Sequence, residues 1–308
     1  MYSEILVPLD GSDVAECVLP HVEAIATRNN AADITFLYVV PPLDMPLVKH
    51  EFKSRIESEA KSGAKDYLRK LVSGLKYKER AHGQVIFGKA ADSILDYAAE
   101  NKMDLIVIAS HGLSGIGRWI RGSVADKVMH ESTVPILRIR ASSPRTPFYK
   151  EGQKMVVLVP LDGSELAETV LVHVKELARQ FGIQSVDIVL LRVCELFSHP
   201  HLHYPPPMPL SWEEYLKYET KKCKEICLTY LADVRKRLKK EGLNIRLEVP
   251  VGSPAEAIVE YVNGKAVSLI VISTHGRTGI GQWAFGSITN KVMRGTSTPA
   301  LLVRCTNQ

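Results

Sequence analysis

The chain has 308 residues, enough for two domains, and its 45% hydrophobic and 24% charged residues are typical of an ordinary soluble protein. The net charge of +5 is small and no basic run is interleaved with aromatic residues, so we expect no nucleic-acid partner. No apolar run approaches the roughly 20 residues that span a bilayer, and the N-terminus lacks a signal-peptide pattern. We therefore expect no membrane partner and a cytoplasmic location.

In the first half, short apolar stretches alternate with amphipathic ones. Apolar or β-branched runs predict strands at Ile5–Leu9, Ile34–Val40, Gln84–Phe87, Leu105–Ala109 and Ile136–Arg140. Helical spacing predicts helices directly after the first strand, over residues 51–75, and at Ala91–Asn101 and Ser123–Glu131. Ser12 or Asp13 is expected to cap the first helix.

The second half repeats this order after a polar segment. Strands are predicted near Val156–Leu161, Val186–Val193, Ile245–Pro250, Leu269–Ser273 and Ala300–Arg304. We expect a first domain at residues 1–141, a Ser- and Pro-containing linker at 142–153 and a second domain at 154–308.

The second half also carries an insertion rich in histidine and proline, at 198–210. After it, Ser211 and Glu214 form a capping-box pattern that opens a long helix ending near Glu241. Histidines alternate at 199, 201 and 203, which fits either a solvated loop or a metal-binding segment.

The five cysteines form no CxxC pair and no zinc spacing. Cys223 and Cys227 lie four apart in a helical stretch and could face the same way. We expect two unreactive thiols there, because a zinc site normally needs about four ligands. A reducing compartment fits this cysteine usage.

The two halves also match residue by residue. Residues 5–26 and 157–178 are identical at 14 of 22 positions, and residues 104–140 and 268–304 at 18 of 37. Short apolar strands that alternate with helices indicate parallel strands covered on both faces. We predict two tandem Rossmann-like, doubly wound α/β domains, each with a five-stranded parallel sheet. Such sheets bind ligands at the carboxyl ends of their strands.

Each half contains a glycine-rich loop between a strand and a helix. In the first it runs from Ala109 through His111 and Gly112 to Gly122 and Ser123. In the second, the same spacing runs from Ser273 through His275 and Gly276 to Gly286 and Ser287. Glycine allows close approach of the backbone, and the amides at the helix start can bind an anion, so the pattern predicts a phosphate cradle. The two histidines either contact that phosphate or shape the turn.

The sequence Pro-Leu-Asp-Gly-Ser ends the first strand of each half and places Asp10 and Asp162 at the same sheet edge. A carboxylate at that edge can accept hydrogen bonds from a ribose or help to hold a metal that bridges phosphates. An acid after the first strand together with an amide cradle after the fourth predicts a nucleotide site in each half.

With these motifs, the chain resembles a tandem universal stress protein. The ATP-binding branch of that family has the pattern G-x2-G-x9-G-[S/T], and here Ala109 and Ser273 replace the first glycine. The resemblance implies an adenine nucleotide in each domain, ATP or ADP or AMP, with magnesium as a further candidate. The nucleotide contacts that it implies are Pro8, Asp10, Val39, Ala109, His111, Gly112, Gly122, Ser123 and Val124 in the first half, and Pro160, Asp162, Val193, Ser273, His275, Gly276, Gly286, Ser287 and Ile288 in the second.

Members of this family commonly pair through their last strands. By that resemblance the two halves would form an intramolecular pseudo-dimer through Pro135–Arg140 and Pro299–Arg304, and a homodimer of chains stays open.

The chain contains no Walker A motif, no GxSxG, no HExxH and no kinase signature. We therefore expect a stress-response protein in which the nucleotide is a regulatory or structural ligand. Two alternatives stay open: a nucleotide-free scaffold that acts through protein partners, and a slow ATPase, since an amide cradle with Mg²⁺ can stabilise charge on a phosphoryl group.

Overall fold

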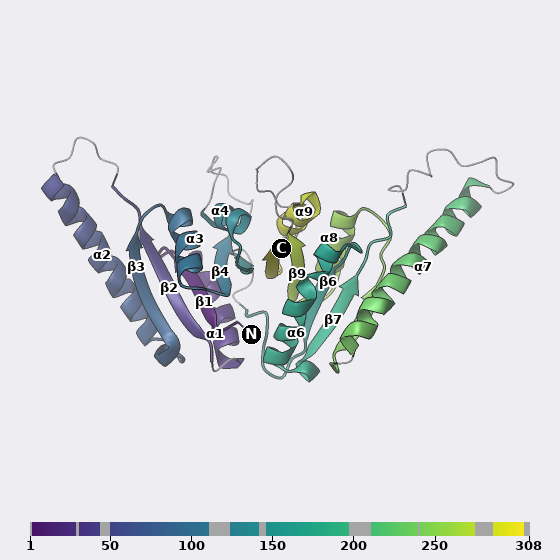
Figure 1. Ribbon diagram of the computed structural model, residues 1–308, viewed down its shortest axis with the longest axis horizontal. Coiled ribbons are helices and arrows are strands. Elements are labelled where there is room, and N and C mark those ends of the chain that lie inside the picture. The colour runs from purple at the N-terminus through teal and green to yellow at the C-terminus, as the bar shows by residue number, and fades with distance from the viewer. Residues whose placement is uncertain are drawn as a thin grey trace. The chain divides into compact units, whose positions relative to one another are not determined.

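A computed structural model describes residues 2–28, 31–43, 50–110, 124–141, 146–196, 211–239, 241–274 and 286–304. It divides into two compact units. The first consists mainly of residues 1–150 and also includes the strand at 300–304, and the second lies between them in the sequence. Both are α/β units (Figure 1).

The first unit is built on a parallel sheet with the strand order β3-β2-β1-β4-β5. These strands are β1 (Glu4–Leu9), β2 (Asp33–Val40), β3 (Ala81–Phe87), β4 (Leu105–Ser110) and β5 (Ile136–Arg140). The order reverses between β1 and β4, so the carboxyl ends of these two strands form the switch point at which doubly wound sheets bind ligands.

The described part of this unit also forms the helices α1 (Leu19–Arg28), α2 (His50–Ser73), α3 (Ala90–Glu100) and α4 (Val124–Glu131). Helix α2 packs on β2 and β3, and α3 packs on β2 and against α4. Buried strands need cover on both faces, and the central residues of β1 from Ile5 to Val7 are fully buried.

A sixth strand makes this sheet mixed rather than purely parallel. Strand β10 (Ala300–Arg304) runs antiparallel to β5, with Leu301 opposite Leu137. Both leucines are buried. The predicted doubly wound α/β fold is confirmed, with five parallel strands in the first half, and β10 adds an antiparallel strand to it. An apolar edge strand is a liability unless it is paired, and here β10 covers the edge of β5.

The described residues of the second unit form parallel strands in the order β9-β6-β7-β8. They are β6 (Met155–Pro160), β7 (Val186–Leu191), β8 (Asn244–Glu248) and β9 (Leu269–Thr274). Its helices are α5 (Glu165–Glu168), α6 (Val170–Phe181), α7 (Trp212–Lys239), α8 (Pro254–Gly264) and α9 (Ser287–Gly295). Helix α7 packs on β7 and β8, and α8 packs against α9. The switch point of this unit lies between β6 and β9.

The helix predicted after the first strand is interrupted in both units. In the first, a 3-10 turn at Ala15–Val18 precedes α1, whose second residue is Pro20, which has no N–H to donate. In the second, α5 and α6 meet at Thr169, whose hydroxyl donates a hydrogen bond to the carbonyl of Leu166, 2.7 Å away.

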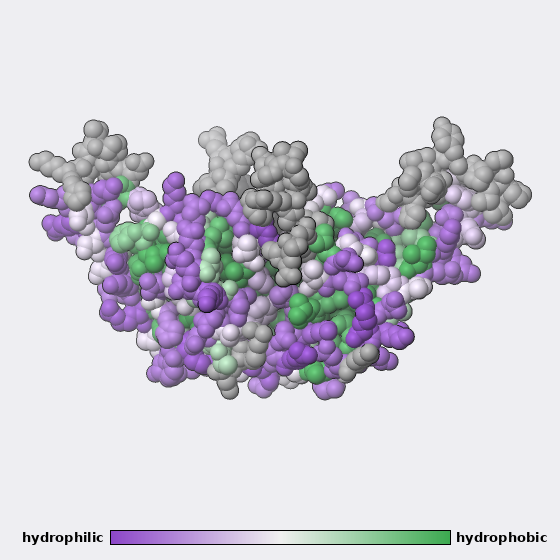
Figure 2. Space-filling model, viewed as in Figure 1, coloured by the Kyte–Doolittle hydropathy of each residue, from purple (hydrophilic) through white to green (hydrophobic). Residues whose placement is uncertain are grey.

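Among the described residues, no helix is long and apolar enough to cross a membrane. On the face seen in Figure 2, hydrophilic residues predominate and apolar residues form separate small patches.

Candidate nucleotide site

The Asp-Gly-Ser sequence after β1 forms a tight turn. The backbone N–H of Ser12 donates to Oδ1 of Asp10 at 2.9 Å, and the N–H of Ala15 donates to Oγ of Ser12 at 3.1 Å. Gly11 has φ of +81°, a conformation that a residue with a Cβ rarely adopts. The hydroxyl of Ser12 therefore caps the 3-10 turn as predicted.

The same turn follows β6 in the second unit. The N–H of Ser164 donates to Oδ1 of Asp162 at 2.8 Å, the N–H of Ala167 donates to Oγ of Ser164 at 3.1 Å, and Gly163 has φ of +97°. In both units the turn fixes an exposed carboxylate at the carboxyl edge of the sheet, beside the switch point.

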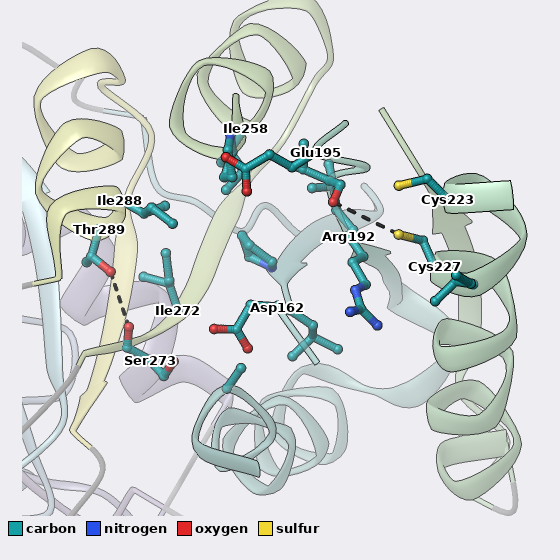
Figure 3. A pocket seen from close by; sticks show the side chains of 17 residues that line it. Asp162, Arg192, Glu195, Cys223, Cys227, Ile258, Ile272, Ser273, Ile288 and Thr289 are labelled. Carbon is teal, nitrogen blue, oxygen red and sulfur yellow. Dashed lines mark hydrogen bonds between the residues drawn. The ribbon is translucent and has the colours of Figure 1, made fainter. Parts of the chain in front are cut away.

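A pocket of about 290 Å³ opens at this edge of the second unit. Its volume is close to the lower limit of the roughly 300–1,000 Å³ typical of small-molecule sites. It brings together the predicted contacts Pro160, Asp162, Val193, Ser273 and Ile288. These five residues come from four elements or their ends, so the fold gathers positions that are up to 128 residues apart in the chain. Figure 3 draws Asp162 between Ser273 on one side and Arg192 on the other.

The remaining wall of the pocket is mostly apolar, and α7, α8 and α9 contribute to it together with α5 and with residues in or after the strands. Ile226 and Ile288 are large apolar residues that are 51% and 39% exposed, yet both line this pocket. An apolar cavity with a few polar groups is the usual composition of a small-molecule site. The other lining residues are Leu161, Ala167, Leu191, Arg192, Glu195, Cys223, Cys227, Pro254, Ile258, Ile272 and Thr289.

Helix α9 begins at this pocket. It starts at Ser287, after Gly286, and its first turn contains no acidic residue. The hydroxyl of Thr289 donates to the carbonyl of Ser273 at 3.3 Å, which attaches the first turn to the end of β9 (Figure 3). The N-terminus of a helix carries a partial positive charge and unpaired amides, so this end of the pocket favours an anion.

Neither residue that replaces the first glycine of the loop needs a glycine conformation. Ala109 lies within β4 and Ser273 within β9, and neither has a positive φ. Both side chains are small and half-buried. The absence of glycine therefore introduces no backbone strain at these two positions.

A tyrosine–glutamate pair flanks each site. Tyr67 donates to Glu16 at 2.8 Å in the first unit, and Tyr230 donates to Glu168 at 2.9 Å in the second. Burial, followed by this hydrogen bond and the charge of the glutamate, raises the pKa of both phenols. The tyrosines therefore stay neutral donors at physiological pH and fix α2 and α7 to the helix start beside the Asp-Gly-Ser turn.

The residue that faces this tyrosine differs between the units. Tyr38 meets Tyr67 edge-on with 6.0 Å between ring centroids, whereas the Arg192 guanidinium lies 4.6 Å from the ring centroid of Tyr230. A guanidinium over an aromatic face is attracted by the ring quadrupole. The second site thus has a cation where the first has an aromatic ring.

The first unit places its predicted contacts at corresponding positions. Pro8 is in β1, Asp10 directly follows it, Val39 is in β2, Ala109 is in β4 and Val124 is the first residue of α4. The other predicted contacts lie outside the described residues; they are His111, Gly112, Gly122, Ser123, His275 and Gly276. The histidines at 199, 201 and 203 lie outside them as well.

The expectation of two unreactive thiols on the long helix is wrong for one of them. Cys223 forms a disulfide with Cys194, and their Cα atoms are 5.8 Å apart. Cys227 is buried, and its thiol donates a weak hydrogen bond to the carbonyl of Val193 at 4.0 Å. Sequence reasoning missed the pair because 29 residues separate its members and no short motif connects them.

Sequence reasoning also missed Arg192 and the apolar wall that includes Ile226 and Ile258. Arg192 directly precedes Val193 and directly follows β7, so its position at the end of the strand was a usable signal. The isoleucines carried no signal, because apolar residues at helical spacing are expected in any packed helix.

Fold and site together define a class: a tandem α/β protein of Rossmann-like topology with a small-molecule pocket at the carboxyl edge of a parallel sheet. The family model for the universal stress protein family matches residues 1–140 and 155–304. The chain belongs to this family and carries two tandem domains of it.

A universal stress protein of Mycolicibacterium smegmatis is 22% identical over 307 residues, covering 97% of this chain and 96% of its own length. The universal stress protein MJ0577 of Methanocaldococcus jannaschii is 28% identical over 159 residues, which cover 49% of this chain and 95% of that protein. The crystal structure of a universal stress protein from Archaeoglobus fulgidus covers 99% of both chains with a TM-score of 0.70 at 18% identity. The fold is thus shared over the full chain.

Proposed function

We propose that this protein is a cytoplasmic stress-response protein that binds ATP or another adenine nucleotide in each domain as a regulatory or structural ligand. The observation that carries the proposal is the pocket of the second unit, which gathers Pro160, Asp162, Val193, Ser273 and Ile288. The family resemblance assigns nucleotide contacts to these same five positions.

The lining of this pocket fits the parts of a nucleotide. The apolar side chains of Ile226 and Ile258 suit the faces of a purine, and Val193 would offer its backbone to the base edge. The Asp162 carboxylate can accept hydrogen bonds from ribose hydroxyls, while its Oδ1 also holds the turn. The N-terminus of α9 lies on the side of the pocket opposite α7 (Figure 3). Phosphates placed there would meet unpaired amides and the positive end of the helix dipole.

A bound Mg²⁺ would neutralise phosphate charge, and a hard oxygen ligand such as the Asp162 carboxylate suits it. The residues of this chain would hold and orient the nucleotide. The turn fixes the carboxylate and the attachment of Thr289 to Ser273 fixes the helix start, so both polar ends are arranged before a ligand arrives.

Calorimetry of the purified full chain with ATP and Mg²⁺ tests the proposal by counting bound nucleotides. We expect two per chain. No binding at millimolar nucleotide would contradict the proposal and favour the nucleotide-free scaffold. Turnover above the background rate that depends on Asp10 or Asp162 would favour the slow ATPase.

Asp162→Asn tests the role of the carboxylate most directly, because it keeps an oxygen acceptor for the N–H of Ser164 and removes only the charge. A hydrogen bond to a charged group contributes about 1.5–3 kcal/mol, so affinity at the second site should fall by roughly 10- to 100-fold. Asp10→Asn is the matched variant, because the same turn holds it, and it should weaken the first site alone.

For the domain organisation we propose boundaries at 1–141 and 154–308 with a linker between them, and pairing of the two domains as an intramolecular pseudo-dimer. The antiparallel pairing of β5 with β10 supports this, because β10 belongs to the second sequence repeat. Whether chains then form a homodimer can be measured by light scattering.

A further inference from the structure

The disulfide of the second unit lies at the wall of its pocket. Cys194 is the third residue after β7, directly follows Val193, and is fully buried. Cys223 lies in the middle of α7, is half-buried and lines the pocket. A Cα–Cα distance of 5.8 Å is within the usual range for a disulfide. The bond therefore attaches α7 to the end of a central strand beside the proposed nucleotide.

The part of α7 that precedes Cys227 has little else to hold it. The buried residues of this helix are Tyr215 near its start and then Cys227, Leu231, Val234 and Leu238 toward its end. The ion pair of Lys217 with Glu213 in this part is within the helix and exposed, so it contributes little. Without the disulfide, the stretch from 216 to 226 is fixed chiefly by the packing at its two ends.

The first unit has no counterpart of this bond. In the strand register, Pro8 lies opposite Leu37 and the equivalent Pro160 lies opposite Leu191, so these two leucines are equivalent. Cys194 is three residues after Leu191, and its equivalent in the first unit is therefore Val40. Tyr67 and Tyr230 are equivalent, because each donates to the corresponding glutamate of its unit. Cys223 is seven residues before Tyr230, so its equivalent in the first unit is Ala60, seven residues before Tyr67. The first domain is therefore an internal control that keeps the fold and lacks both thiols.

We propose that Cys194 and Cys223 are a reversible thiol-modification site at which a peroxide forms the disulfide, which fixes the α7 wall and strengthens ligand binding in the second pocket alone. The ligand in this proposal is the adenine nucleotide, so that part rests on the proposed function. A disulfide in a cytosolic protein is usually transient and redox-sensing, which agrees with the proposed location.

The two thiols have different roles in the reaction. Cys223 lines the open pocket, so its thiolate attacks a peroxide oxygen: an S–O bond forms, the O–O bond breaks and one water or alcohol leaves. The sulfur of the buried Cys194 then attacks that sulfur while its proton passes to the leaving oxygen; the S–S bond forms, the S–O bond breaks and a water is released. The two thiols lose two electrons and the peroxide gains them, and a small thiol reductant reverses the change.

The exposure of the two thiols favours this order. Cys223 is half-buried at the open pocket, which Arg192 and Glu195 also line, whereas Cys194 is fully buried. Cations favour the thiolate, which is the reactive form. Figure 3 shows that the sulfurs of Cys223 and Cys227 both point from α7 toward the pocket. Burial raises the pKa of the Cys227 thiol, so Cys227 stays protonated and does not compete.

The test compares the full chain after treatment with hydrogen peroxide and after reduction with a phosphine. Mass spectrometry of a digest should find the peptide pair joined through Cys194 and Cys223 only in the oxidised sample. Amide hydrogen exchange over residues 212–222 should be slower in the oxidised chain, while α2 of the first unit should not change. Absence of the linked peptide, or equal exchange in both states, would overturn the proposal.

The binding test uses calorimetry with ATP and Mg²⁺ on the same two samples. Immobilising a mobile wall should tighten the second site by about three- to tenfold and leave the first unchanged. Cys223→Ser should remove the difference between the samples, whereas Cys227→Ser should retain it. Equal affinities in both states, with nucleotide bound, would refute the coupling.

A chain that binds no nucleotide in either state would refute the proposed function and, with it, the coupling to nucleotide. The linked peptide and the exchange data would still decide whether the cysteine pair is a redox site.

Discussion

Gly295, the last residue of α9, faces α8 where a side chain has no room. A Cβ built on it would lie 2.7 Å from Cγ2 and 3.0 Å from Cγ1 of Val259. Carbon atoms in contact are normally about 3.5–4.0 Å apart. Gly295→Ala therefore forces the valine into another rotamer or moves the two helices apart.

The expected loss of stability follows from two opposing terms. Overpacking of this kind costs about 1–3 kcal/mol. Alanine is a better helix former than glycine by roughly 0.8–1 kcal/mol, and less of that gain applies at a helix end. We expect Gly295→Ala to destabilise the second unit by about 1–2 kcal/mol.

The matched control is Gly264→Ala at the end of α8, where an added Cβ would have no atom within 4 Å. It should be neutral or slightly stabilising. The assay is amide hydrogen exchange of peptides from α8 and α9, because a two-domain chain need not unfold in one step. Val259→Ala removes both clashing methyl groups. The loss of unfolding free energy that it causes should therefore be smaller in the Gly295→Ala variant than in the wild type. The reasoning fails if Gly295→Ala is as stable as Gly264→Ala, or if the two substitutions are additive.

Three further predictions concern the turns, a buried histidine and the sheet edge. Ser164→Ala and Ser12→Ala each remove a capping hydroxyl and should cost about 1 kcal/mol, measured by urea unfolding; no change in either would show that the caps contribute nothing. Burial lowers the pKa of His21 to about 4 from 6.5, and its Nδ1 accepts the N–H of Phe148 at 3.1 Å. The unfolded chain then binds the extra proton between pH 6.5 and 4, so stability should be fully present above pH 6.5 and fall by about 3 kcal/mol as the pH drops to 4. His21→Leu should flatten this part of the pH profile, and an unchanged slope would exclude His21 as its cause. Leu302→Lys places a charge at a position only 3% exposed and should lower the melting temperature; an unchanged value would contradict the β5–β10 pairing.

The sequence was sufficient to predict the central strands and the position of the site. Runs such as Ile5–Leu9 and Leu105–Ala109 are short and apolar on both faces, and their alternation with amphipathic helices favours buried parallel strands. The Asp-Gly-Ser turn was predictable because glycine and a capping serine have few other uses directly after a strand.

What the sequence could not predict depends on contacts between distant segments. The partner of β10 is one example, because its apolar composition indicates a buried strand and only the family resemblance indicated the edge of β5 as its neighbour. The pairing of Cys194 with Cys223 is another, since it requires the crossing of α7 over the end of β7. The apolar wall of the pocket is a third, because Ile226 differs from an ordinary helix residue only by its surroundings.

The pairing of β10 with β5 has a consequence for synthesis on the ribosome. Domains generally fold as units, with the N-terminal one first. Here the strand that covers the edge of β5 begins 160 residues after β5 ends (from Arg140 to Ala300). The nascent first unit therefore keeps an uncovered apolar edge until β10 has been translated, and a ribosome that stalls before residue 300 leaves an edge that can pair with other chains.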